Sequence, residues 1–142
     1  MTRQEVPFSQ LFIRIAIALT MLSAVADRFG FWGVDSAWGN WDNFEQYTRK
    51  LTFFFPESLS RFSAYAATGF EIILPVMLLL GYKTRIAAYA SGILLLIFAL
   101  SMTLALGVKA PLDYSVWIGS AAAFLLAYQQ EFPISLDQLT KK

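Results

Sequence analysis

The chain has 142 residues, of which 57% are hydrophobic and 15% are charged, and its formal net charge is +1. Soluble proteins carry about 25% charged residues, so this composition indicates a small integral membrane protein of one domain. The near-neutral charge excludes nucleic-acid binding, and the absence of cysteine and histidine excludes thiol chemistry, Cys-held clusters and nearly all zinc or copper sites, so a redox role requires a borrowed cofactor.

The first apolar run covers about residues 8–26 and is long enough to cross a bilayer as a helix. Arg14 interrupts this run, and two interpretations of it stay open. Its side chain either snorkels to the near membrane surface, or it pairs with a carboxylate inside the protein. Asp27 ends a stripe of small polar residues on another face of the same span, beside Ala16 and Thr20.

The long connection at residues 29–61 holds three of the four tryptophans. Within it, residues 40–51 are typical of a short amphipathic helix, because Asn40 can cap its N-terminus and Trp41 shares one face with Phe44. Such a helix lies in the headgroup plane or covers the bundle. Its aromatic face is either an interfacial anchor or a wall for a ring-shaped ligand.

The second apolar run, residues 62–81, places Glu71 almost at its midpoint. A charge there costs roughly 2.5 to 3.5 kcal/mol on insertion scales, so the carboxylate is expected to face the protein interior. Ala64, Thr68 and Pro75 share its helical face and predict a small, polar seam. Glu71 is then either a hydrogen-bonding residue that joins two helices or the centre of a ligand or proton site.

The remaining spans are predicted at about residues 86–107 and 114–128, after a tight turn at 81–85 that makes a helical hairpin. Between these two spans, Asp113 either complements the N-terminal dipole of the fourth helix or forms an ion pair with Lys109. Lys83 and Arg85 in the short turn favour an orientation with both termini in the cytoplasm.

With these residues in view, the chain resembles the DoxX family of small four-span bacterial membrane proteins. The resemblance rests on Arg14 in residues 11–14, on Glu71 followed by residues 79–88, and on residues 109–115. It departs at Pro75, where the family often has glycine. The resemblance implies a multi-pass protein of the bacterial inner membrane, a redox protein as partner, and Arg14 with Glu71 as the principal residue pair, with Lys109 and Asp113 second.

The predicted fold is therefore all-α, a transmembrane four-helix bundle with a short interfacial helix between the first two spans. The leading hypothesis is a non-catalytic or cofactor-borrowing subunit that binds a quinone-like amphiphile near Glu71 and serves a redox partner. Two alternatives stay open: an assembly protein without a ligand, and a small proton-coupled transporter. The lipid bilayer is an expected partner, and a homo-oligomer is a further option. No metal site and no self-contained catalytic constellation is expected.

Overall fold

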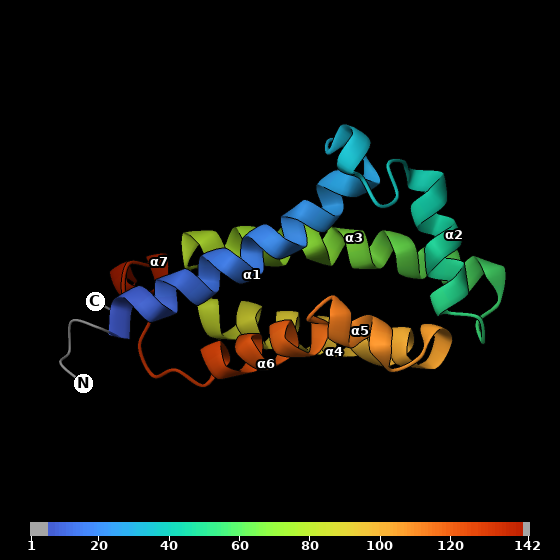
Figure 1. Cartoon of the computed structure of the whole chain (residues 1–142). Coiled ribbons are helices and arrows are strands. Elements are labelled where there is room, and N and C mark those ends of the chain that lie inside the picture. The colour runs from blue at the N-terminus through green and yellow to red at the C-terminus, as the bar shows by residue number, and fades with distance from the viewer. Residues whose placement is uncertain (1–5, 141–142) are drawn as a thin grey trace.

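The computed structural model describes residues 6–140, which are helical and contain no strand (Figure 1). Three long helices and one shorter helix form the bundle, and four short elements connect or end them. The bundle helices are α1 (Val6–Arg28), α3 (Glu57–Leu80), α4 (Thr84–Leu106) and α6 (Val116–Ala127). The short elements are η1 (Gly33–Asp35), α2 (Trp41–Leu51), α5 (Lys109–Asp113) and α7 (Leu136–Leu139). The predicted four-helix bundle with an amphipathic helix after the first span is confirmed.

Three of these helices, α1, α3 and α4, are long and apolar enough to cross a membrane. Each contains most of the span expected from sequence. The fourth span differs, because α6 has only 12 residues and begins after a short interruption of the helical backbone. Ser115 has φ +56°, in the left-handed region, so the helix expected from residue 114 begins only at Val116, and the connection before it forms the separate short helix α5.

In the bundle, α1 packs on α3 and α6 packs on α4, while α3 and α4 form the central hairpin (Figure 1). Small and branched side chains fill the centre, among them Ala18, Leu78, Ala88 and Leu126, each at most 1% exposed. Large apolar side chains cover the outside, as on Phe12, Phe62, Ile86 and Ile118. An apolar exterior of this kind matches lipid contact.

The contact between α4 and α6 depends on Gly92. A Cβ atom at this position would lie 2.9 Å from the ring of Phe124, which is closer than real Cβ contacts. Ser120 lies on the same seam and donates a hydrogen bond to the Gly92 carbonyl at 2.8 Å. The small residue lets the two backbones approach, which is how helices associate in lipid.

The amphipathic helix α2 lies across the end of the bundle that is opposite α7, and packs on α3 and α4 (Figure 1). Asn40 caps it, accepting a hydrogen bond from the Asn43 backbone N–H at 2.9 Å, as predicted. Its apolar face turns inward, with Phe44 only 5% exposed. On the polar face, the Arg61 guanidinium of α3 hydrogen-bonds Glu45 at 2.9 Å and lowers the pKa of that carboxyl. Ion pairs thus connect the polar face of α2 to α3.

Candidate functional site

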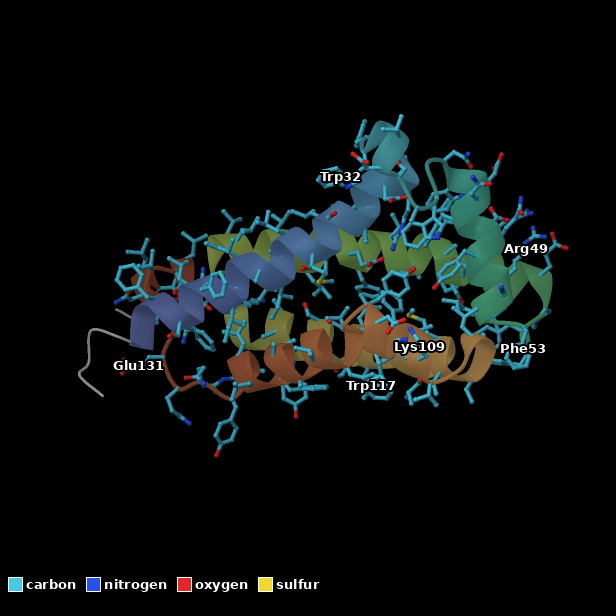
Figure 2. All side chains as sticks on the ribbon, in the orientation of Figure 1. Trp32, Arg49, Phe53, Lys109, Trp117 and Glu131 are labelled. Atoms are coloured by element: carbon cyan, nitrogen blue, oxygen red, sulfur yellow. The ribbon has the colours of Figure 1, made fainter. Side chains whose placement is uncertain are left out.

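Two polar clusters lie between α1 and the rest of the protein, one near each end of α1. The Arg28 cluster contains Arg28, Thr68 and Glu71, covered by Phe44 of α2. The Arg14 clasp contains Arg14, Gly81 and Asp137, at the end where α7 lies. Figure 2 shows the side chains of both regions on the ribbon, with Glu131 near the clasp and Trp32 near the Arg28 cluster.

In the Arg28 cluster, the guanidinium forms an ion pair with Glu71. It also donates a hydrogen bond to the Thr68 hydroxyl at 2.6 Å, and Thr68 in turn donates to the Ala64 carbonyl at 2.9 Å. Arg28 and Glu71 are 2% and 3% exposed. The inward, small-polar face predicted for the second span is confirmed, and its carboxylate is fully enclosed.

Aromatic rings from the long connection close the Arg28 cluster. The guanidinium carbon lies 3.9 Å from the ring centroid of Phe44 and 5.7 Å from that of Trp38. Asp27 positions this segment, because its carboxylate accepts hydrogen bonds from the backbone N–H groups of Ala37 and Trp38, both at 2.7 Å, and of Gly39 at 3.2 Å. Consecutive residues Asp27 and Arg28 therefore hold the connection and α3 in a fixed arrangement.

The predicted small polar stripe on α1 that leads to Asp27 does not form a helix-packing face along its length. Ala16 and Thr20 are exposed on α1, and only the Asp27 end is buried. Trp41 is half-buried and contacts Tyr65 of α3, with the two rings tilted by 34° and their centroids 4.7 Å apart. The rings of the connection thus contact one another and α3.

Arg14 neither snorkels nor pairs with Glu71, so both sequence interpretations are wrong. It is 1% exposed and donates hydrogen bonds to the Leu78 carbonyl at 3.0 Å and to the carbonyls of Pro133 and Ile134, each at 3.1 Å. The last turn of a helix leaves carbonyl groups without intrahelical donors, and they carry the negative end of the helix dipole. Arg14 therefore binds the C-terminus of α3 and the segment before α7.

Gly81 makes this clasp sterically feasible. It has φ +65° at the end of α3, and a Cβ atom there would lie 2.6 Å from an Arg14 nitrogen and 2.3 Å from the Ser135 Cβ. The Gly81 carbonyl accepts a hydrogen bond from the Asp137 N–H at 2.9 Å. Only glycine satisfies both the left-handed backbone and the close approach.

Asp137 completes the clasp by capping α4. Its carboxylate accepts hydrogen bonds from the backbone N–H groups of Lys83 at 2.6 Å and Thr84 at 2.7 Å. Burial raises the pKa of this carboxyl, but the N–H groups of Thr84 and Lys83 and the charge of Arg14 outweigh burial and hold the pKa below its usual value. The segment after α6 is thereby fixed to α1, α3 and α4 at once.

Lys109 and Asp113 form an ion pair within α5, as one of the two interpretations predicted. The side chains are 85% and 54% exposed, so the pair is a surface feature. The capping interpretation of Asp113 is wrong, because Asp113 ends α5 and α6 begins three residues later at Val116. Figure 2 shows Lys109 on α5 toward the α2 end, with Trp117 on α6 pointing away from the bundle.

Sequence reasoning missed Arg28 and Asp137. A signal for Arg28 was present, because side chains lean toward the N-terminus of their own helix. In antiparallel α1 and α3, Arg14 and Glu71 lean apart, whereas Arg28 and Glu71 lean toward each other. Arg28 follows the last apolar residues of the first span, a position typical of a charged residue at the membrane surface. The connection folds back over this end and buries it.

A family described as methylamine utilisation protein MauE matches residues 6–113, which is more than half of the chain. The chain belongs to the MauE family. The DoxX assignment is thus replaced by MauE, while the expectation of a small multi-span membrane family is confirmed. No curated protein and no solved structure matches the chain.

The MauE match contains the whole Arg28 cluster and its cover, from α1 through α5. It ends at Asp113, so α6 and α7 lie outside it. Arg14 falls within the matched residues, whereas Pro133, Ile134 and Asp137, its partners in the clasp, do not. The Arg28 cluster is therefore the polar centre of the part that this chain has in common with MauE.

The chemistry available to the Arg28 cluster is limited. Arginine stays protonated in proteins, so it cannot act as a proton relay. Its two terminal nitrogens donate to Thr68 and Glu71, whereas its buried Nε has no hydrogen-bond partner among the described residues. A ligand could reach the carboxylate only by displacing Arg28, which Phe44 and Trp38 cover. The arrangement is suited to joining α1, α2 and α3.

Proposed function

We propose that this MauE-family protein is a non-catalytic membrane subunit that supports a redox complex by protein contact. The observation that carries the proposal is that its central intramembrane carboxylate, Glu71, is enclosed and paired with Arg28. A chain without cysteine or histidine supplies no thiol or imidazole for redox chemistry. What it supplies is a rigid bundle with an ordered, aromatic cap.

The family description supports the redox context. Converting methylamine and water to formaldehyde and ammonia releases two electrons and two protons, so methylamine utilisation needs an electron acceptor. A membrane subunit without its own redox group serves such a system by assembling or anchoring the protein that carries the electrons.

The quinone-like amphiphile near Glu71 is the second candidate, because the rings of Trp38 and Phe44 lie over Arg28 and Phe44 also contacts Trp41. The shortest ring contact there, between Trp41 and Tyr65, has a centroid distance of 4.7 Å. A planar ligand would have to enter between rings that already contact one another. This cost favours the assembly role over ligand binding. The ion pair with Arg28 favours it over a proton-coupled transporter, in which Glu71 would have to leave that partner in each cycle.

We place both termini in the cytoplasm and the bundle in the bacterial inner membrane. The support is the short turn with Lys83 and Arg85, near which α1 begins and α7 ends (Figure 1). The chain termini themselves lie outside residues 6–140. The α2 end then faces the opposite side, where Phe31 is 81% exposed and Figure 2 shows Phe53 directed away from the bundle.

The test is complementation of a strain that lacks the protein, grown on methylamine. The informative variant replaces the pair together, Arg28→Met with Glu71→Leu, because it removes both charges and keeps the volume. We expect this double variant to restore growth, and the purified wild type to carry no stoichiometric quinone. Failure of a folded double variant to restore growth, or quinone that is lost with the double substitution, contradicts the proposal.

A further inference from the structure

A hollow lies on the outer surface where α4 begins and α6 ends. Figure 1 shows these helix ends on the same side of the bundle as α7. The volume of the hollow is about 510 Å³, and it is an open depression, not an enclosed cavity. It is distinct from both polar clusters. The lining residues are Arg85, Tyr89, Phe124, Ala127, Tyr128 and Gln130.

The polar groups of the hollow gather at its membrane-surface end. Arg85 is the second residue of α4, Tyr128 follows the last residue of α6, and Gln130 lies just beyond. One Arg85 nitrogen donates to the Gln129 carbonyl at 2.9 Å, which fixes the guanidinium at the rim. Within the described part of the chain, no carboxylate lies within ion-pair distance of Arg85.

The other end of the hollow is apolar. Tyr89 lies one turn deeper than Arg85, about 6 Å along α4. Its ring packs edge-on against Phe124, with centroids 5.5 Å apart. A charged rim above an aromatic wall suits a molecule with an anionic head and an apolar tail.

The geometry points to a binding site for an anionic phospholipid, with its phosphate at Arg85 and its acyl chain along Tyr89 and Phe124. A guanidinium presents several donors in a fork that matches phosphate oxygens, and it lacks a competing carboxylate here. A neutral quinone carbonyl would use one of these donors and leave the charge uncompensated. Tyr128, 80% exposed, adds a hydroxyl at headgroup depth.

The experiment measures lipid retention by native mass spectrometry on the full chain purified in mild detergent, with phosphatidylglycerol or phosphatidylcholine added. The wild type is expected to retain phosphatidylglycerol preferentially. Arg85→Gln should weaken retention about tenfold, the loss expected for a charge-assisted hydrogen bond. The matched control is Lys83→Gln, which removes the same charge from the same turn outside the hollow and should have no effect.

Three results would overturn the site. One is equal retention of the two lipids by the wild type, and another is an equal loss in Lys83→Gln, which would indicate diffuse charge attraction. The third is displacement of the lipid by millimolar inorganic phosphate or by a short-chain quinone, which would assign the hollow to those ligands. Arg85→Gln is checked for folding by its thermal unfolding, and Tyr128→Ala, which keeps all charges, should also weaken retention.

Discussion

The Arg28–Glu71 pair makes a quantitative prediction about stability. At an effective dielectric constant near 20, two unit charges about 4 Å apart attract by about 4 kcal/mol. Breaking such a buried pair by removing one partner costs about 3–5 kcal/mol, because the other charge is left without compensation. We therefore expect Glu71→Gln to lower the free energy of unfolding by about 3 kcal/mol or more.

The two single substitutions, Glu71→Gln and Arg28→Met, should lower the free energy of unfolding by different amounts. Without Glu71, the guanidinium remains charged and buried, since arginine does not lose its proton in proteins. Without Arg28, the carboxyl can take up a proton and keep a hydrogen bond to its surroundings. Arg28→Met should therefore cost less than Glu71→Gln, and a methionine sulfur can also contact the Phe44 ring with about 0.3–1.5 kcal/mol of stabilisation.

The double variant Arg28→Met with Glu71→Leu should recover most of the loss. Replacing a buried ion pair by apolar residues of similar volume is often neutral or stabilising. Thr68 loses a donor but still donates to Ala64. The sum of the single losses should then exceed the loss in the double variant by about 3 kcal/mol.

The assay is reversible unfolding in mixed micelles of mild and denaturing detergent, followed by circular dichroism and tryptophan fluorescence. The control is a double-mutant cycle on an exposed ion pair within one helix, with Lys109→Gln and Asp113→Asn. The interaction energy between these two residues should be about 0.3–0.5 kcal/mol. If the Arg28 and Glu71 losses add within about 0.5 kcal/mol, the two residues act independently and the reasoning fails.

Three further predictions concern other parts of the chain. The pKa of Asp137 is lower in the folded protein than in the unfolded chain, so its contribution to stability is complete above the unfolded pKa and is lost as pH falls through the folded pKa. Asp137→Asn should therefore make the free energy of unfolding depend less steeply on pH below about 4. An unchanged slope in that pH range would refute this. Gly92→Ala should destabilise by about 1–3 kcal/mol through contact with Phe124, whereas Gly69→Ala, with open space around it, should be neutral or stabilising in the same unfolding assay. Reporter fusions at both termini should show cytoplasmic activity, and opposite activities would exclude the proposed topology.

Several features were predictable from sequence because they depend on local periodicity and composition. The apolar runs required helices, since backbone groups in lipid must bond within their own segment. The spacing of Ala64, Thr68 and Glu71 defined an inward face, and Asn40 with the aromatic pattern after it defined α2. These properties follow from neighbours along the chain.

The interaction partners of the two buried charged residues, Glu71 and Arg14, were established only by the tertiary structure. The sequence predicted that Glu71 faces inward, and side-chain direction favoured Arg28 as its cation, but only the fold of the connection over Arg28 explains why that residue is buried beside it. Arg14 looked equally isolated in the first span, yet its partners are carbonyls of a helix end and of residues more than a hundred positions away. Periodicity determines which side of a helix faces inward, whereas the depth and tilt at which helices meet depend on contacts between residues distant in sequence.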